Sequence, residues 1–107
     1  MKPDSDGFGI NVLQTDGAAM VCLSGELDIA TAPRLREELI WLVNSGIHAV
    51  TVDLARVTFI DSTGMSVLVM AMKRLREKGG DLELRSPNPA TRNIFEVTGL
   101  TKVFAIS

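Results

Sequence analysis

Cysteine, histidine and aromatic residues are scarce in this chain of 107 residues, which contains one Cys, one His, one Trp and no Tyr. The single Cys22 cannot form an internal disulfide, and one thiol with one imidazole cannot supply the clustered ligands of a zinc or other soft-metal site. We therefore expect neither a metal nor a cofactor. Cys22 lies within the apolar run of residues 18–23, so we expect it to fill space in the core.

Positive charge is not in excess either. The 11 Lys and Arg residues are interleaved with 13 Asp and Glu residues, and the formal net charge is -2. Nucleic-acid binding needs a basic stripe or patch, so we expect no nucleic-acid partner. No stretch approaches the roughly 20 apolar residues that a membrane span needs, and the first seven residues lack the apolar segment of a signal peptide. The composition predicts a cytoplasmic protein that does not enter a membrane.

The length is typical of one compact domain. Hydrophobic residues make up 46% of the chain and are spread along all of it, which is enough for one core. We expect a single domain over residues 1–107, with residues 1–6 flexible. Any function must therefore lie on the surface of that domain.

Strand-like and helix-like segments alternate along most of the chain. Residues 8–14 and 18–24 are strand-like, and Asp16-Gly17 between them is the short turn that favours an antiparallel hairpin. Helical spacing predicts helices over 33–45, from residue 61 or 62 to 78, and over 87–99, with strands at 47–54, 81–85 and 102–106. This order predicts an α/β fold, a mixed β-sheet opened by an N-terminal hairpin and continued by helical crossovers.

The predicted crossovers return the chain to one edge of the sheet. Asp28 follows the second strand, and Asp61 and Ser62 follow the third, so these three residues should be neighbours. The carboxyl ends of parallel strands are where α/β domains commonly place their chemistry. The sequence therefore predicts a functional edge around Asp28, Asp61 and Ser62.

Ser62 stands in the segment Ile60-Asp61-Ser62-Thr63-Gly64, for which two interpretations compete. Asp61 or Ser62 could simply cap the second helix, because short side chains with an oxygen bond the free amides of a first helical turn. Gly64 favours a functional loop, since a glycine in a first turn is better explained by close backbone approach or by an accessible surface.

Ser62 lacks the neighbouring groups that a catalytic serine needs. A nucleophilic serine needs a base within hydrogen-bond reach, and the single imidazole, His48, begins the strand that Ser62 follows. A strand of that length separates the two by roughly 20 Å at about 3.3 Å per residue. The sequence also lacks a phosphate-binding glycine loop and an acidic pair for Mg²⁺. We predict that the chain is not an enzyme.

Four segments, taken in order, resemble the anti-sigma-factor antagonists of bacteria, which are stand-alone STAS domains. They are Gly25-Glu26-Leu27-Asp28 with Thr31-Ala32, Val52-Asp53-Leu54 with residues 57–60, Asp61-Ser62-Thr63-Gly64-Met65, and residues 98–104. Each segment alone is weak evidence, but the four together are specific and cover nearly the whole chain. The resemblance implies the same mixed sheet with helices.

The resemblance also implies a mechanism. Ser62 would be phosphorylated by an ATP-using anti-sigma factor kinase, with Asp61, Thr63, Gly64 and Asp28 near the phosphorylation site. The unmodified protein would bind the anti-sigma factor and release the sigma factor, phosphorylation would end this binding, and a phosphatase would restore it. Such a phosphoprotein would regulate transcription in bacterial stress or sporulation signalling, as a monomer or weak dimer. Family members commonly carry a further short helix after the last strand, and we expect it to be absent here.

The second predicted helix offers a docking surface beside Ser62. Its expected core stripe is Met65, Leu68, Val69, Met72 and Leu75. Val67 and Met70 lie opposite that stripe, on the flank shared with Arg74. We predict that Met65, Val67, Met70 and Arg74 contact the partner. The alternative is a constitutive adaptor subunit of a larger complex such as a transporter, which needs no phosphorylation.

Overall fold

Two antiparallel strands open the chain, as the Asp16-Gly17 turn predicts. In the computed structural model, which describes residues 7–107, β1 (Gly9–Thr15) pairs with β2 (Ala18–Leu27) across this turn. Gly17 has a φ of 72°, a left-handed conformation that glycine adopts without strain. The hairpin is confirmed, and the predicted flexibility of residues 1–6 lies outside the described residues.

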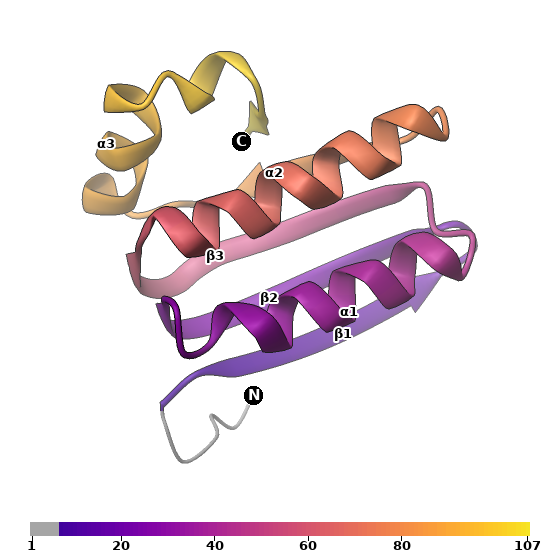
Figure 1. Ribbon diagram of the computed structural model, residues 1–107, viewed down its shortest axis with the longest axis horizontal. Coiled ribbons are helices and arrows are strands. Elements are labelled where there is room, and N and C mark those ends of the chain that lie inside the picture. The colour runs from indigo at the N-terminus through magenta and orange to yellow at the C-terminus, as the bar shows by residue number, and fades with distance from the viewer. Residues whose placement is uncertain (1–6) are drawn as a thin grey trace.

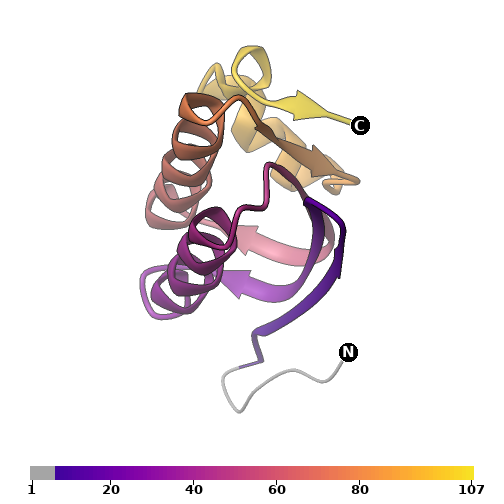
Figure 2. The same cartoon turned by 90° about the vertical axis from the view of Figure 1, so that its right-hand side faces the viewer.

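The rest of the sheet is parallel and follows chain order. Strands β3 (Ala49–Ile60), β4 (Asp81–Arg85) and β5 (Ala105–Ile106) extend the sheet from β2 in the order β1-β2-β3-β4-β5. The helices α1 (Ala32–Asn44), α2 (Ser62–Glu77) and α3 (Pro89–Val97) connect successive parallel strands. Helices α1 and α2 lie side by side on one face of the sheet (Figures 1 and 2). The predicted α/β fold with helical crossovers is confirmed.

The two central strands are longer than the sequence pattern predicted. The predicted ends were Ser24 and Leu54, whereas β2 continues to Leu27 and β3 to Ile60. The pairing register shifts on both sides of Gly25, whose φ is 89°. Strict alternation of apolar residues fails in such irregular stretches, which is why the extension was missed. The longer strands carry the chain to the edge where the β2–α1 and β3–α2 loops meet.

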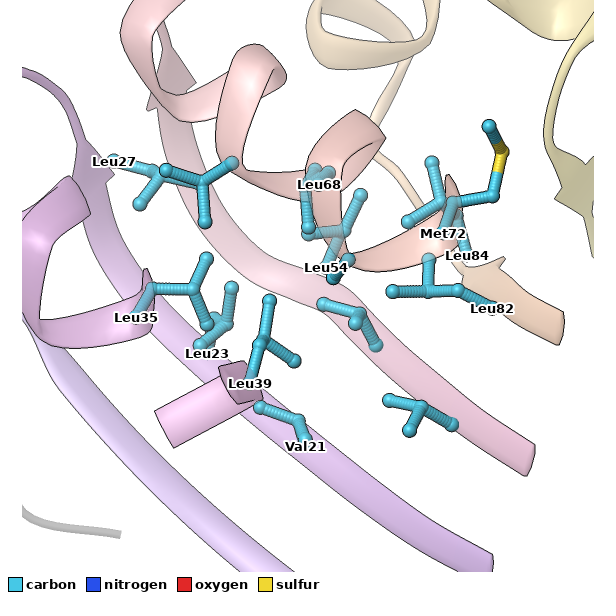
Figure 3. Packing of buried hydrophobic residues seen from close by; sticks show 14 of the residues in the cluster. Val21, Leu23, Leu27, Leu35, Leu39, Leu54, Leu68, Met72, Leu82 and Leu84 are labelled. Carbon is cyan, nitrogen blue, oxygen red and sulfur yellow. The ribbon is translucent and has the colours of Figure 1, made fainter. Parts of the chain in front are cut away.

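The core lies between the sheet and the pair of helices. Leu35 and Leu39 of α1 face Val21 and Leu23 of β2, and Leu68 and Met72 of α2 approach β3 and β4 (Figure 3). The four leucines named are at most 1% exposed. Burying such side chains contributes about 1.5–3 kcal/mol each, so this layer holds both helices firmly on the sheet.

Helix α2 turns a different face to the core from the one predicted. Its buried residues are Gly64, Val67, Leu68, Ala71, Met72 and Leu75. Met65 and Val69 are only half-buried, and Val67 is 7% exposed, so the prediction of an exposed Val67 is wrong. The small residues Gly64 and Ala71 let the helix approach its neighbours closely, and a pattern that counts only large apolar residues does not include them.

The face of β1 and β2 away from α1 and α2 is left without a helix among the described residues (Figure 2). Along β2, buried Val21 and Leu23 alternate with half-buried Met20 and Cys22. Successive side chains of a strand point to opposite faces, so Cys22 faces away from the helices. The prediction that Cys22 fills the core is therefore wrong.

The end of the chain is less extended than predicted. A 3₁₀ helix over Leu100–Lys102 follows Gly99, which has a φ of 77°, and β5 contains two residues instead of the predicted five. Phe104 turns inward to meet Phe95 of α3 edge to face, with ring centroids 6.1 Å apart. Within residues 7–107, no helix is both long and apolar enough to cross a membrane.

Candidate functional site

The β2–α1 and β3–α2 loops are joined at the carboxyl edge of the sheet. Because β2 and β3 are parallel and pair Leu27 with Ile60, both strands end at the same level. The Asp61 amide donates to the Leu27 carbonyl at 3.1 Å, and the Ile29 amide donates to Asp61 Oδ2 at 3.2 Å. The structure thus brings the two predicted loops together.

Asp61 is the N-cap of α2. Its Oδ1 accepts a hydrogen bond from the Gly64 amide at 2.9 Å. One carboxylate therefore serves both the first turn of α2, through Oδ1, and the neighbouring loop, through Oδ2. Of the two capping candidates, Asp61 makes the cap and Ser62 becomes the first residue of the helix, so capping does not account for the Ser62 hydroxyl.

Ser62 presents its side chain to solvent. It is exposed, and within residues 7–107 its hydroxyl makes no hydrogen bond, while its carbonyl accepts one from Ser66 Oγ at 2.9 Å. Thr63, the next hydroxyl, is half-buried. A free, exposed hydroxyl at a helix N-terminus is accessible to a modifying enzyme, and the free amides of the first turn favour an anion there.

Asp28 shapes the neighbouring loop. Its Oδ1 accepts from the Ala30 amide at 2.9 Å and from the Thr31 amide at 3.1 Å. Thr31 stands at the N-cap position of α1, but its hydroxyl donates to the Glu26 carbonyl and accepts from the Asp28 amide instead of capping the helix. Asp28 therefore lies next to the Ser62 junction with its carboxylate committed to the loop backbone.

Gly64 lies where the first turn of α2 contacts the end of β2. A Cβ at this position would lie 2.6 Å from Leu27 Cγ and 3.0 Å from the Leu27 carbonyl oxygen. Contacts below 3.0 Å force atoms to move, so the first turn of α2 can approach Leu27 only without a side chain at residue 64. Of the two reasons that the sequence offered for Gly64, close backbone approach is confirmed.

An open groove of about 590 Å³ runs along the exposed side of α2. It is lined by Ser62, Met65, Ser66, Val69, Met70, Lys73, Arg74, Glu77 and Leu100. Three of the predicted contact residues, Met65, Met70 and Arg74, line this groove, and the buried Val67 does not. Sequence reasoning missed Val69, which was assigned to the core, and Leu100, which comes from a distant segment whose position depends on the tertiary fold.

Within residues 7–107, the imidazole that a nucleophilic serine would need lies far from Ser62. His48 is exposed and precedes β3, whereas Ser62 follows its end, and β3 is twelve residues long. Among residues 7–107, no group of three or more His, Cys, Asp or Glu side chains could hold a metal ion. What the junction does provide is an exposed hydroxyl, fixed carboxylates and a partly apolar groove, which suit modification and protein binding.

Comparison with known proteins connects this arrangement to one family. The sequence model of the STAS domain matches residues 9–107. The chain is 34% identical over 100 residues to an anti-sigma-B factor antagonist of Bacillus subtilis, covering 94% of this chain and 91% of that protein. It is 37% identical over 87 residues to the anti-sigma-B factor antagonist of Listeria monocytogenes, covering 80% and 75%. A crystal structure of an anti-sigma factor antagonist from Mycobacterium paratuberculosis superposes with a TM-score of 0.86 at 31% identity, covering 98% and 89% of the two chains.

Proposed function

This chain belongs to the STAS domain family, and we propose that it is an anti-sigma factor antagonist controlled by phosphorylation of Ser62. In its unmodified form it binds an anti-sigma factor kinase in the cytoplasm and thereby releases the sigma factor. Phosphorylation of Ser62 by that kinase ends the binding, and a phosphatase restores it. The observation that carries the proposal is the exposed, unbonded Ser62 hydroxyl at the junction of the α2 N-terminus with an apolar groove.

The fold can tolerate a phosphate on Ser62. A phosphoserine adds about -1.5 to -2 charges at neutral pH, and an anion at a helix N-terminus is favoured by the free amides and the helix dipole. Asp61 already holds the first turn through Gly64, so the helix does not depend on the Ser62 hydroxyl for its start. Modification should therefore leave the free protein folded.

A partner would not tolerate the same phosphate. The cationic residues of the groove, Lys73 and Arg74, are eleven and twelve residues along α2 from Ser62, which is roughly 17 Å at 1.5 Å per residue. The groove thus supplies no nearby cation to neutralise the phosphate, and Asp61 lies beside it. Burying these charges in an interface could cost a few kcal/mol, or roughly a hundredfold in affinity.

The groove residues Met65, Met70 and Arg74 are proposed contacts for the partner, together with Val69. Apolar side chains lie near Ser62, and Lys73 and Arg74 outnumber the single carboxylate, Glu77, further along the groove, which suits an apolar partner surface flanked by acidic groups. Val67 is excluded from this set because it is buried.

Phosphorylation with site mapping tests the proposal. The protein is incubated with ATP and the anti-sigma factor kinase of the same bacterium, and the modified residue is identified by mass spectrometry. We expect phosphate on Ser62 and not on Ser66, which is also exposed and lies one turn further along α2. Modification at Ser66, or none with a demonstrably active kinase, would contradict the proposal.

Binding of charge variants provides the second test. We expect Ser62→Ala to bind the anti-sigma factor as the unmodified protein does, and Ser62→Asp to bind at least tenfold more weakly. Ser45→Asp is the matched control, because Ser45 is an exposed serine beyond the far end of α1 and the substitution adds the same charge. Equal binding by Ser62→Ala and Ser62→Asp would indicate a constitutive adaptor instead.

A further inference from the structure

Ile29 is an exposed apolar residue beside the Ser62 junction. It lies in the β2–α1 loop and is 74% exposed, although its amide is hydrogen-bonded to Asp61, the residue that precedes Ser62. A single exposed apolar residue means little by itself. Its backbone, however, belongs to a loop whose amides are hydrogen-bonded to side chains.

Every backbone amide from residue 28 to residue 31 is bonded to a side-chain oxygen. The Asp28 amide donates to Thr31 Oγ1, the Ile29 amide to Asp61 Oδ2, and the Ala30 and Thr31 amides to Asp28 Oδ1. Of these four bonds, the one from Ile29 alone reaches outside the loop, to the N-cap of α2. The loop therefore holds Ile29 in one position relative to Ser62.

An exposed apolar side chain on a fixed backbone is suited to binding. Burial against a partner removes apolar surface from water, and little backbone freedom is lost because the loop is already ordered. We propose that Ile29 is a contact residue for the anti-sigma factor and that Asp61 is the positioning residue that holds it there. This inference rests on the proposed function and extends its contact surface from the α2 groove, across Ser62, to the β2–α1 loop.

The position of Ser62 between these two surfaces gives the phosphate a second effect. Ser62 lines the groove and directly follows Asp61, whose Oδ2 holds the Ile29 amide. A partner that covers both the groove and Ile29 must exclude water from Ser62. A phosphate there would keep water and counterions in the middle of the contact surface. Binding of the partner to the α2 groove and to Ile29 would then be weakened together.

The first experiment compares two exposed apolar residues in binding to the anti-sigma factor of the same bacterium. Ile29→Ala removes three carbon atoms, each of which contributes about fourfold in affinity when fully buried. With about half of that surface buried against the partner, we expect binding to weaken about tenfold. Val97→Ala is the matched control, because Val97 is also 74% exposed but lies at the end of α3. We expect its affinity to stay within about twofold of the unchanged chain.

The second experiment tests positioning by Asp61. In Asp61→Asn the amide oxygen can still accept from Gly64, but the side-chain NH₂ cannot accept from Ile29. We expect faster hydrogen exchange at the Ile29 amide with the Gly64 amide still protected, and about fivefold weaker binding. In the Ile29→Ala background, Asp61→Asn should cause little further loss, because the residue that it positions is gone.

The outcomes separate the two proposals. If the unchanged chain does not bind the anti-sigma factor, the proposed function fails and this inference fails with it. If the unchanged chain binds and Ile29→Ala binds equally well, the contact role of Ile29 alone is overturned. If Asp61→Asn weakens binding as much in the Ile29→Ala background as in the unchanged chain, Asp61 acts on the partner or the helix directly, and the positioning role is overturned.

Discussion

Replacing Gly64 by alanine should destabilise the protein, although the same change stabilises most helices. In an exposed helix, alanine is more favourable than glycine by about 1 kcal/mol. At residue 64 the new Cβ would lie 2.6 Å from Leu27 Cγ and 3.0 Å from the Leu27 carbonyl oxygen, so the first turn of α2 and the end of β2 must shift relative to each other. Overpacking of this kind costs about 1–3 kcal/mol. Because the same movement weakens the Asp61 amide bond to Leu27, we expect a net loss of about 1–2 kcal/mol.

Urea and thermal unfolding of purified Gly64→Ala measure this loss. For a domain of this size, about 1 kcal/mol lowers the melting temperature by about 4–8 °C. Ser66→Ala serves as the control on the same helix, since Ser66 is exposed and its hydroxyl bonds back to the Ser62 carbonyl. It should be neutral or stabilising by about 0.5 kcal/mol. A Gly64→Ala protein that is more stable than the unchanged chain would refute the close-contact reasoning.

Three further predictions concern other parts of the fold. Phe95→Ala should lower the free energy of unfolding by about 3–5 kcal/mol in urea titration, because Phe95 is fully buried against Phe104; a loss below about 1 kcal/mol would contradict this packing. The hydrogen bond from Arg76 lowers the pKa of Asp81 below its ordinary value of 3.8. The stability that this pair contributes to the folded protein is therefore present at pH values above 3.8 and is lost as the pH falls through the lowered pKa. Asp81→Asn should therefore cost about 0.5 kcal/mol at neutral pH, and this cost should shrink as the pH is lowered through the depressed pKa of Asp81; a cost that does not change with acidification would be inconsistent with the pair. Trp41, the single tryptophan, is 56% exposed, so acrylamide should quench its fluorescence readily in the native protein, and strong protection would argue against this position.

The order of elements could be read from the sequence because local signals mark it. Asp16-Gly17 specifies the hairpin, and helical spacing with Gly46 and Gly79 beyond the helix ends marks α1 and α2. The edge that holds Asp28, Asp61 and Ser62 then follows from parallel crossovers alone. These features depend on nearest neighbours and connection rules, both of which a single sequence contains.

The details that were missed depend on contacts between distant segments. Val67 was predicted to be exposed because only large apolar residues defined the core stripe, whereas Gly64 and Ala71 set which side of α2 is buried. Cys22 sits in an apolar run, yet alternation along β2 turns it to the face without α1 and α2. Leu100 reaches the groove only through the turn at Gly99.

The bonds that define the Ser62 junction join residues far apart in the chain. The Ile29 amide and the Asp61 carboxylate are 32 positions apart, and Leu27 and Asp61 are held together only after β2 and β3 pair. Contacts of this kind require the intervening chain to close into a loop, which costs entropy. A nascent or misfolded chain contains the same residues, Asp61-Ser62-Thr63-Gly64, but not the surface that the folded junction presents. A kinase that recognises the folded junction would consequently act only on folded molecules, so the amount of phosphorylated protein would report the amount of folded protein.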